Sequence, residues 1–481
     1  MKVHTLNVAS AMLATLLSIS SLDAQAQAIV TGRVTDGHKG LAEVPVTDGF
    51  NITYSDKDGN YTLTTSEEAR FVYITTPSGY TAPIEQNTIP KFYQPLSEGE
   101  TVYDFTLYKN KHNDKKHTFV VHSDAQVTST DDLHQYKSVV DDCRKTIKGI
   151  KGEVFGIDCG DIVGDTPSLY PNYIDTVSEL DIAMYRAIGN HDMTYYGRSH
   201  ETSTQTFENY FGPTRYSFDK GNAHYIVIDN CFFVGREYFY MGYIDEKTFK
   251  WLEQDLARVP KGSLVFLIMH IPSQLTEKPQ QFKYDYFTIA DQTVNAQALH
   301  HFLKDYKVHI ISGHMHYNLN MVFNDNIMEH NTAAACGTWW QIPECLDGTP
   351  RGYAVYEVDG NNVEWYYKGA GHDRDYQMRV YGIGECEEYP ADVVANVWNY
   401  DSKWTVELIE DGVKTATMEK FSGYDPYTKV LCSDRSKLKY DWIYPTQNEH
   451  MFRATPRNAN AKLQVKVTDR FGNIYIQDVT K

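Results

Sequence analysis

Five short apolar segments of this 481-residue chain each end in side chains that can bind a metal ion. Short apolar segments bounded by glycine and polar residues are typical of buried strands. In a layered α/β fold, the loops at the carboxyl ends of such strands form the active site. The pattern therefore predicts an α/β domain that gathers oxygen and nitrogen ligands in one place. The side chains that follow the five segments are Asp124 and Gln126, Asp161 and Asp165, Asn190 with His191 and Asp192, His270, and His314 with His316.

Helices are expected between these strands. In residues 131–148, the apolar side chains of Leu133, Tyr136 and Val140 recur near one face, which is the spacing of an amphipathic helix. Strands that alternate with helices favour an α/β layer fold over an all-β one. Two further helices are predicted at residues 245–258 and 293–304.

In order and spacing, the five motifs resemble those of the calcineurin-like metallophosphoesterase superfamily, whose blocks are Asp-x-His/Gln, Gly-Asp, Gly-Asn-His-Asp, His and Gly-His-x-His. The resemblance covers roughly residues 116–368 and implies a central α/β-sandwich domain. It also implies a site for two metal ions, with Asp161 as the bridging carboxylate. The other implied ligands are Asp124, His316 and, as a further candidate, Gln126 for the first metal, and Asn190, His270 and His314 for the second.

The resemblance implies a reaction as well, which is hydrolysis of a phosphate mono- or diester by a metal-activated water. Oxygen and nitrogen donors without sulfur suit divalent Mn, Fe, Zn or Co better than Ca or Mg, and the residues do not choose among the four. His191 resembles the general acid of the family, which protonates the leaving oxygen, with Asp192 holding the imidazole. Asp165 is expected to support the ligands rather than to bind a metal.

Two departures from the motifs of known subfamilies argue against membership in those subfamilies. Gly164 stands three residues after Asp161, where purple acid phosphatases carry a tyrosine ligand. The arginine of the second motif of protein Ser/Thr phosphatases is also missing from this chain. The leading hypothesis is thus a metal-dependent phosphatase or phosphodiesterase outside both groups. The alternative is a non-catalytic, metal-containing binding protein for a phosphorylated or glycan ligand, against which the nearly complete ligand set argues.

The two ends of the chain differ from the central region in their sequence pattern. Residues 29–112 alternate short β segments with Asp-Gly turns, and a similar alternation returns after residue 371, so each end predicts a β-sandwich. The N-terminal one resembles carboxypeptidase-regulatory-like domains, and the C-terminal one is immunoglobulin-like in style. The predicted division is a signal peptide at 1–28, an N-terminal β-sandwich at 29–112, a phosphoesterase domain at 113–370 and a C-terminal β-sandwich at 371–481.

Charge and targeting signals bear on partners and location. A net charge of −18 argues against binding a nucleic-acid backbone, which needs a cationic face. A small phosphorylated substrate with a sugar, nucleotide or lipid head group remains compatible, because bound dications reverse the local field. Lys2, followed by an apolar run to Ile19 and small residues near position 26, predicts a signal peptide and a soluble periplasmic or secreted protein. No later segment is long enough to span a bilayer, and the sequence does not indicate an oligomeric state.

Cysteines and aromatic residues complete the sequence-based expectations. The seven cysteines show no CxxC spacing, so buried free thiols are expected, with Cys336–Cys345 as the one pair near enough for a local bridge. Aromatic inserts at 194–200 and 281–287, together with Trp339 and Trp340, predict an aromatic-lined cleft for a sugar, base or lipid group. The alternative for these aromatic side chains is packing against the flanking domains.

Overall fold

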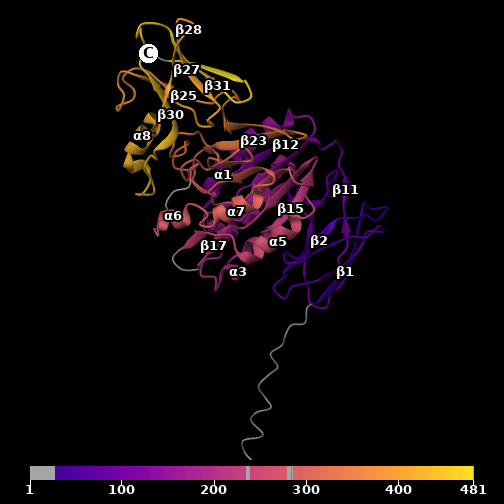
Figure 1. Ribbon diagram of the computed structural model, residues 1–481. Helices are drawn as coiled ribbons and strands as arrows, with labels where there is room; N and C mark the ends of the chain where they lie inside the picture. The colour runs from indigo at the N-terminus through magenta and orange to yellow at the C-terminus, as the bar shows by residue number, and fades with distance from the viewer. Residues whose placement is uncertain (1–27, 235–238, 279–282, 284, 480–481) are drawn as a thin grey trace, which may run out of the picture.

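The computed structural model describes residues 28–234, 239–278, 283 and 285–479, and Figure 1 shows its three parts in chain order. The β-rich N-terminal part (indigo) and the C-terminal part (yellow) lie on different sides of a central part that contains both sheets and helices. The predicted signal peptide, apart from residue 28, and several positions of the second aromatic insert fall outside the described residues. Among the residues that are described, no helix is both long and apolar enough to cross a membrane.

The central part is built on two sheets, one of five strands and one of six. In the first sheet, strands β12, β13 and β14 are parallel, and in the second, β16, β19, β20 and β22 are parallel. The first sheet contains, in spatial order, β14 (Met184–Arg186), β13 (Glu153–Asp158), β12 (Lys116–His122), β23 (Gly352–Asp359) and β24 (Asn362–Gly369). The second contains β15 (Tyr216–Lys220), β16 (Ala223–Val227), β19 (Leu264–Ile268), β20 (Lys307–Ser312), β22 (Ile327–Asn331) and β21 (Leu319–Val322).

Aromatic side chains hold the two sheets together. Phe119 of β12 stacks on Phe155 of β13, with ring centroids 5.4 Å apart. Its edge contacts Phe266 of β19 in the other sheet at 5.0 Å. Buried rings of this kind contribute area and a preferred geometry, so they fix how the sheets face each other. The predicted mixed α/β architecture of the central part is therefore confirmed.

The three predicted helices are present as α1 (Thr130–Lys148), α5 (Glu246–Leu256) and α7 (Ala296–Leu303). Ser129 caps α1 by accepting a hydrogen bond from the backbone N–H of Asp132, and Asp245 caps α5 in the same way. These caps explain why both helices begin close to the predicted positions. The other α-helices of the described residues are α2 (Tyr170–Val177), α3 (His200–Ser203), α4 (Gln205–Phe211), α6 (Tyr286–Ala290) and α8 (Pro426–Ser433).

The N-terminal part packs directly on the central sheets and shares their core. The ring of Phe92 lies 4.6 Å from that of Tyr216, and the Tyr73 hydroxyl donates a hydrogen bond of 2.7 Å to the carbonyl of Arg215. Arg186 of β14 also donates to the Thr88 hydroxyl at 2.9 Å. The main strands of this part are β1 (Ile29–Thr35), β4 (Asn60–Thr64) and β10 (Phe105–Thr106) in one sheet, and β3 (Ile52–Tyr54), β2 (Pro45–Thr47), β5 (Phe71–Ile74) and β9 (Tyr93–Pro95) in another.

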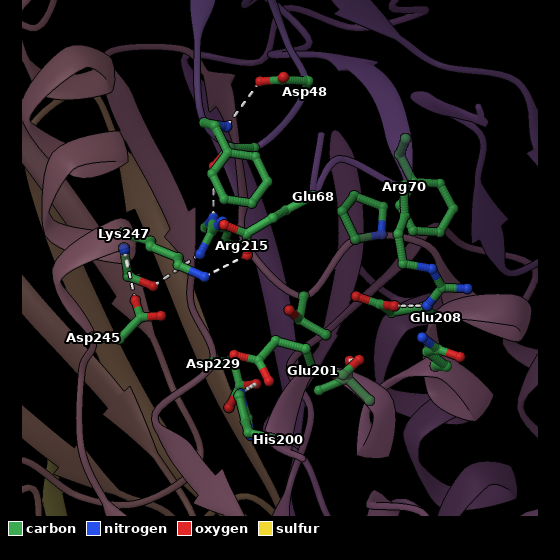
Figure 2. A pocket seen from close by; sticks show the side chains of 18 of the residues that line it. Asp48, Glu68, Arg70, His200, Glu201, Glu208, Arg215, Asp229, Asp245 and Lys247 are labelled. Carbon is green, nitrogen blue, oxygen red and sulfur yellow. Dashed lines mark hydrogen bonds and ion pairs between the residues drawn. The ribbon is translucent and has the colours of Figure 1, made fainter. Parts of the chain in front are cut away.

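A cavity of about 350 Å³ lies at this junction, lined by both parts. Figure 2 shows that its charged side chains point toward one another rather than toward an open centre. The ion pairs join Arg70 to Glu208 and Lys247 to Glu68, and His200 contacts Asp229 at 3.1 Å. Arg215 donates to the carbonyl of Gly49 at 2.8 Å and to the Thr248 hydroxyl at 3.2 Å. The cavity is thus a polar junction between the two parts, which two ion pairs cross.

The C-terminal part consists of two four-stranded antiparallel sheets. Buried aliphatic side chains such as Val406, Leu408 and Val465 alternate with more exposed ones and form its core. The first sheet is β25 (Arg379–Tyr381), β26 (Val393–Asn396), β30 (Asn448–Ala454) and β29 (Glu419–Gly423), and the second is β28 (Val413–Thr417), β27 (Thr405–Glu410), β31 (Leu463–Thr468) and β32 (Ile474–Asp478).

All seven cysteines are buried free thiols, as expected from the lack of paired spacing. The suggested bridge between Cys336 and Cys345 is wrong. The two thiols are directed at different backbone carbonyls, that of Gly337 for Cys336 at 3.5 Å and that of Ala334 for Cys345 at 3.7 Å. Proximity in sequence was a poor guide here because the intervening loop turns the two side chains apart.

Candidate metal centre

The predicted ligands meet where strands of both sheets end. Asp124 follows β12, and Asp161 follows β13, which are neighbours in the first sheet. His270 follows β19, and His314 follows β20, which are neighbours in the second. Because the strands run parallel within each sheet, their carboxyl ends deliver these side chains to the same edge of the sandwich. Asp124 and His314, which are 190 positions apart in sequence, thereby become neighbours.

One cluster converges on the Nε2 atom of His270. The Nδ1 atom of this imidazole is 2.7 Å from the carbonyl of Cys159, which accepts its proton. Nε2 then faces Asp161 Oδ2 at 3.2 Å, Asn190 Oδ1 at 3.1 Å and His314 Nδ1 at 3.2 Å. A proton on Nε2 can be shared with only one of these lone pairs at a time, whereas a cation can accept all of them. A carbonyl that fixes the tautomer of a histidine is a common support for metal ligands.

A second cluster forms around Asp124. His316 places Nε2 3.4 Å from Asp124 Oδ1, while its Nδ1 lies 3.4 Å from the carbonyl of Gly337. The other carboxylate oxygen accepts the hydroxyl of Ser123 and the backbone N–H of His314, the latter at 2.9 Å. The two clusters adjoin, since His314 contributes its backbone to one and its side chain to the other.

Gln126 contacts the first cluster and leaves one atom without a partner. Its side-chain amide donates to Asp161 Oδ2 at 3.0 Å, but its Oε1 atom is buried and accepts no hydrogen bond within the protein. A buried acceptor without a partner costs free energy unless something else satisfies it. The unsatisfied oxygen, the converging lone pairs and the O/N donor set together fit a divalent cation.

The backbone around the centre is strained in a way that metal sites and active sites often are. Non-glycine residues rarely adopt positive φ, because the side chain then crowds the backbone. Gly160, at φ 89°, allows a close approach, since a Cβ atom there would lie 2.7 Å from Nδ1 of His270. The predicted ligands with positive φ are Asp124 (50°), Gln126 (38°), Asp161 (52°), His314 (72°) and His316 (55°).

The buried carboxylates and imidazoles of the centre shift each other's pKa values. Burial acts to raise the pKa of Asp161. The nearby imidazoles of His270 and His191 outweigh it and hold this pKa well below its usual range. Burial opposes protonation of His270, but the Asp161 carboxylate raises the pKa of that imidazole to about 9. Burial and the charge of His270 lower the pKa of His314 to about 3. The buried carboxylates therefore demand positive charge, which a proton or a metal ion can supply, and metal binding would release that proton.

His191 lies beside Asp161 but is the most open of these imidazoles, with 31% of its side chain exposed. Its backbone N–H donates to Asp161 Oδ1 at 2.8 Å, and its Nδ1 contacts both carboxylate oxygens of Asp165 at 3.0 Å. Although burial opposes it, the charge of Asp161 and the hydrogen bond to Asp165 raise the pKa of His191 to about 9. A cation bound at Asp161 would counteract part of that shift.

The expectation that Asp192 holds this imidazole is wrong, because Asp165 does so. Asp192 is buried under the loop, where its carboxylate accepts the backbone N–H groups of Ile162, Val163 and Gly189 and the hydroxyl of Tyr170. Adjacent residues of a helical turn point to different sides, so Asp192 and His191 do not face each other. Asp192 is the third residue after Gly189, and its carboxylate accepts the backbone N–H of Gly189, as in a helix capping box. The spacing of these two residues in the sequence was the signal for this structural role.

Sequence reasoning missed two groups beside His314. The hydroxyl of Tyr240, in β18 (Tyr240–Gly242), lies 3.5 Å from Nε2 of His314, and Asp291 Oδ1 lies 4.0 Å from the same atom. Burial and the charge of Asp285 raise the pKa of Asp291 to about 6. Neither residue belongs to a recognisable sequence motif, so only the folded chain reveals that they flank the centre.

Two family models match the ends of the chain. The family model described as the N terminal of calcineurin-like phosphoesterase matches residues 28–110, and the one described as the C terminal of calcineurin-like phosphoesterase matches residues 329–475. The chain belongs to the calcineurin-like metallophosphoesterase superfamily. No curated protein matches it in a sequence search.

Solved structures that resemble the chain include a dimetal phosphatase from Danio rerio, with 15% identity, a TM-score of 0.38 and coverage of 53% of this chain and 97% of that one. A purple acid phosphatase from yellow lupin (Lupinus luteus) has 12% identity and a TM-score of 0.38, covering 68% of this chain and 67% of that one. A 5′-nucleotidase from Candida albicans has 14% identity and a TM-score of 0.32, covering 55% and 53%. Similarities of this size say nothing about the substrate.

Proposed function

We propose that the protein hydrolyses phosphate esters with the help of two divalent metal ions held at this centre. The observation that carries the proposal is the convergence of Asp161, Asn190 and His314 on Nε2 of His270, next to a second cluster made by Asp124 and His316. When bound, the metal ions would neutralise phosphate oxygens and lower the pKa of a water molecule. Asp161 is the proposed shared ligand, and Gln126 is proposed as a ligand through Oε1.

The chain's own contribution to the reaction is the delivery of a proton. We assign His191 as the general acid, since it is partly exposed beside Asp161 and its Nδ1 is held by Asp165. This arrangement leaves Nε2 to donate a proton to the leaving oxygen as the phosphorus–oxygen bond breaks. Without that proton the leaving group departs as an alkoxide, which is a poor leaving group. Asp165 and Asp192 are positioning residues, the first for the imidazole and the second for the loop.

The proposal is tested by assaying the protein after loading with Mn²⁺ against p-nitrophenyl phosphate and bis-p-nitrophenyl phosphate. We expect turnover of at least one ester, and loss of turnover in protein stripped of metal. The preferred ester then decides between monoesterase and diesterase. If metal-loaded protein turned over neither, the non-catalytic binding protein would be the better hypothesis.

The first proposed metal should bind more weakly than the second. Gln126 would supply a neutral amide oxygen where most members of the superfamily carry an imidazole, and an amide oxygen is the weaker donor to a transition metal. We expect calorimetric titration of metal-free protein with Mn²⁺ to show two affinities, separated by about tenfold or more. In Gln126→His the two should converge, whereas Gln464→His, in the C-terminal part, should change neither. Equal, tight binding at both sites of the unmodified protein would rule the idea out.

We further propose the domain division at residues 29–112, 113–370 and 371–481, with a carboxypeptidase-regulatory-like fold at the N-terminus and an immunoglobulin-like fold at the C-terminus. The antiparallel pairing of the C-terminal sheets supports the last assignment. The apolar run after Lys2 supports export, and a small phosphorylated molecule is the proposed substrate.

A further inference from the structure

A row of aromatic rings leads from a proposed metal ligand to the protein surface. The imidazole of His316 stacks on the indole of Trp339, with centroids 4.4 Å apart and planes at 26°. Trp339 in turn meets Trp442 at 4.5 Å and 87°. His316 is buried, whereas Trp442 is 50% exposed. Trp442 is therefore separated from the metal centre by a single ring.

Trp442 belongs to the C-terminal part, in the segment between α8 and β30. Its neighbour Ile443 is fully buried in a cluster with Ile342, which anchors the main chain next to Trp442. The side-chain oxygen of Gln341 accepts the backbone N–H of Lys439 at 2.9 Å, and the carbonyl of Leu346 accepts that of Thr446 at 2.9 Å. The indole is thus held in place beside the centre, which lowers the entropy cost of binding a ligand there.

The backbone of the segment around Trp339 directs this side chain toward His316. Both Trp339 and Trp340 have positive φ, 45° and 62°, which is unfavourable for bulky side chains. Trp340 is buried, and its indole N–H donates to the carbonyl of Ala125 at 2.9 Å, which ties the loop to the segment between Asp124 and Gln126. Trp339 is then free to cover His316 instead. Packing accounts for Trp340. Trp442 stacks on Tyr440, with ring centroids 5.1 Å apart, and meets Trp339, yet half of it stays exposed to solvent.

Positive charge accompanies these rings. Arg435, Lys437 and Lys439 lie within a few residues of Trp442 in a chain whose net charge is −18. The guanidinium of Arg435 lies 4.5 Å from the ring centroid of Tyr444, and the ammonium group of Lys439 lies 5.1 Å from that of Tyr440. Lys437 is paired with Asp434 at 3.1 Å and Asp441 precedes Trp442, so the segment carries a small excess of positive charge, which favours an anionic phosphoester.

We propose that Trp442 and Trp339 form a binding surface for the organic group of the substrate, and that this group carries a ring with an apolar face. Indole faces bind nucleobases by stacking and sugar rings through their apolar C–H faces, so the shared chemistry is an apolar ring face. The inference rests on the proposed phosphoesterase function, because the phosphate would lie at the metal centre. It makes the C-terminal part a specificity element, whereas the chemistry stays in the central part.

The kinetic test compares three monoesters with the metal-loaded enzyme: adenosine monophosphate, glucose 6-phosphate and glycerol phosphate. In Trp442→Ala we expect KM for the ring-bearing ester that the enzyme prefers to rise about tenfold with little change in kcat, as for loss of one stacking contact. The rise for acyclic glycerol phosphate should be much smaller. Trp442→Phe should restore most of the loss, and Tyr108→Ala, which removes an exposed ring from the N-terminal part, serves as the control.

A binding measurement keeps the inference separate from the proposed function. Adenosine and methyl glucoside lack a phosphate, so their binding to the full chain, followed by calorimetry, does not depend on turnover. We expect one of the two to bind, and Trp442→Ala to weaken that binding about tenfold. Equal effects on cyclic and acyclic esters, or ligand binding that is indifferent to Trp442→Ala, would overturn the aromatic surface. Absence of turnover with intact, Trp442-dependent ligand binding would instead overturn the phosphoesterase.

Discussion

Replacing Asp161 by alanine should remove both metal ions and lower phosphoesterase activity by more than about 10³-fold, which exceeds the usual loss for a single donor to the transition state. This carboxylate is buried, contacts His270 at 3.2 Å and accepts hydrogen bonds from Gln126 and His191. It is the proposed ligand that the two clusters share. Metal content measured by elemental analysis and turnover measured on the preferred ester check the prediction together.

Two controls separate loss of metal from loss of fold. Asp161→Asn keeps the shape of the side chain but removes its charge, so it should fold and still bind metal poorly. Asp131→Ala, an exposed carboxylate in the first turn of α1, should retain both metals and full activity. Two equivalents of metal in folded Asp161→Ala would exclude a bridging role.

Replacing His191 by alanine should lower turnover by about 10²- to 10⁴-fold, the range for loss of a general acid, while metal content stays unchanged. The effect should be largest for esters with alkyl leaving groups and smallest for p-nitrophenyl esters, because a stable phenolate needs less protonation. Turnover across a series of leaving groups, with metal analysis of the same samples, provides the measurement. A loss of the same size for every leaving group would indicate stabilisation of phosphate charge instead.

The two aspartates near His191 should respond differently to substitution. Asp165→Asn removes the charge that holds the imidazole, so it should show a milder form of the same leaving-group dependence. Asp192→Asn weakens acceptors for three backbone N–H groups, so its main effect should be a lower melting temperature. The opposite ranking would restore Asp192 as the imidazole's partner.

Much of the fold was predictable because its signals are local. The helix at residues 130–148 follows from apolar spacing and the Ser129 cap, and the strands that end at Asp124 and Asp161 follow from short apolar runs bounded by glycine and polar residues. The partner of His191 was not predictable in this way. Both Asp165 and Asp192 are close to it in the motifs, and only the direction of each side chain in the folded loops distinguishes them.

The class of the protein and the proposed ligand set follow from the sequence alone, because the order and spacing of the motifs place those side chains at strand ends whatever the packing. The surroundings of these ligands depend on the tertiary structure. Tyr240 and Asp291 reach the centre from distant segments, Trp442 lies one ring further out against Trp339, and Phe92 of the N-terminal part packs on Tyr216 of the central part. Such contacts arise from side chains that are buried together by the whole chain, and no local pattern specifies which distant residues will meet.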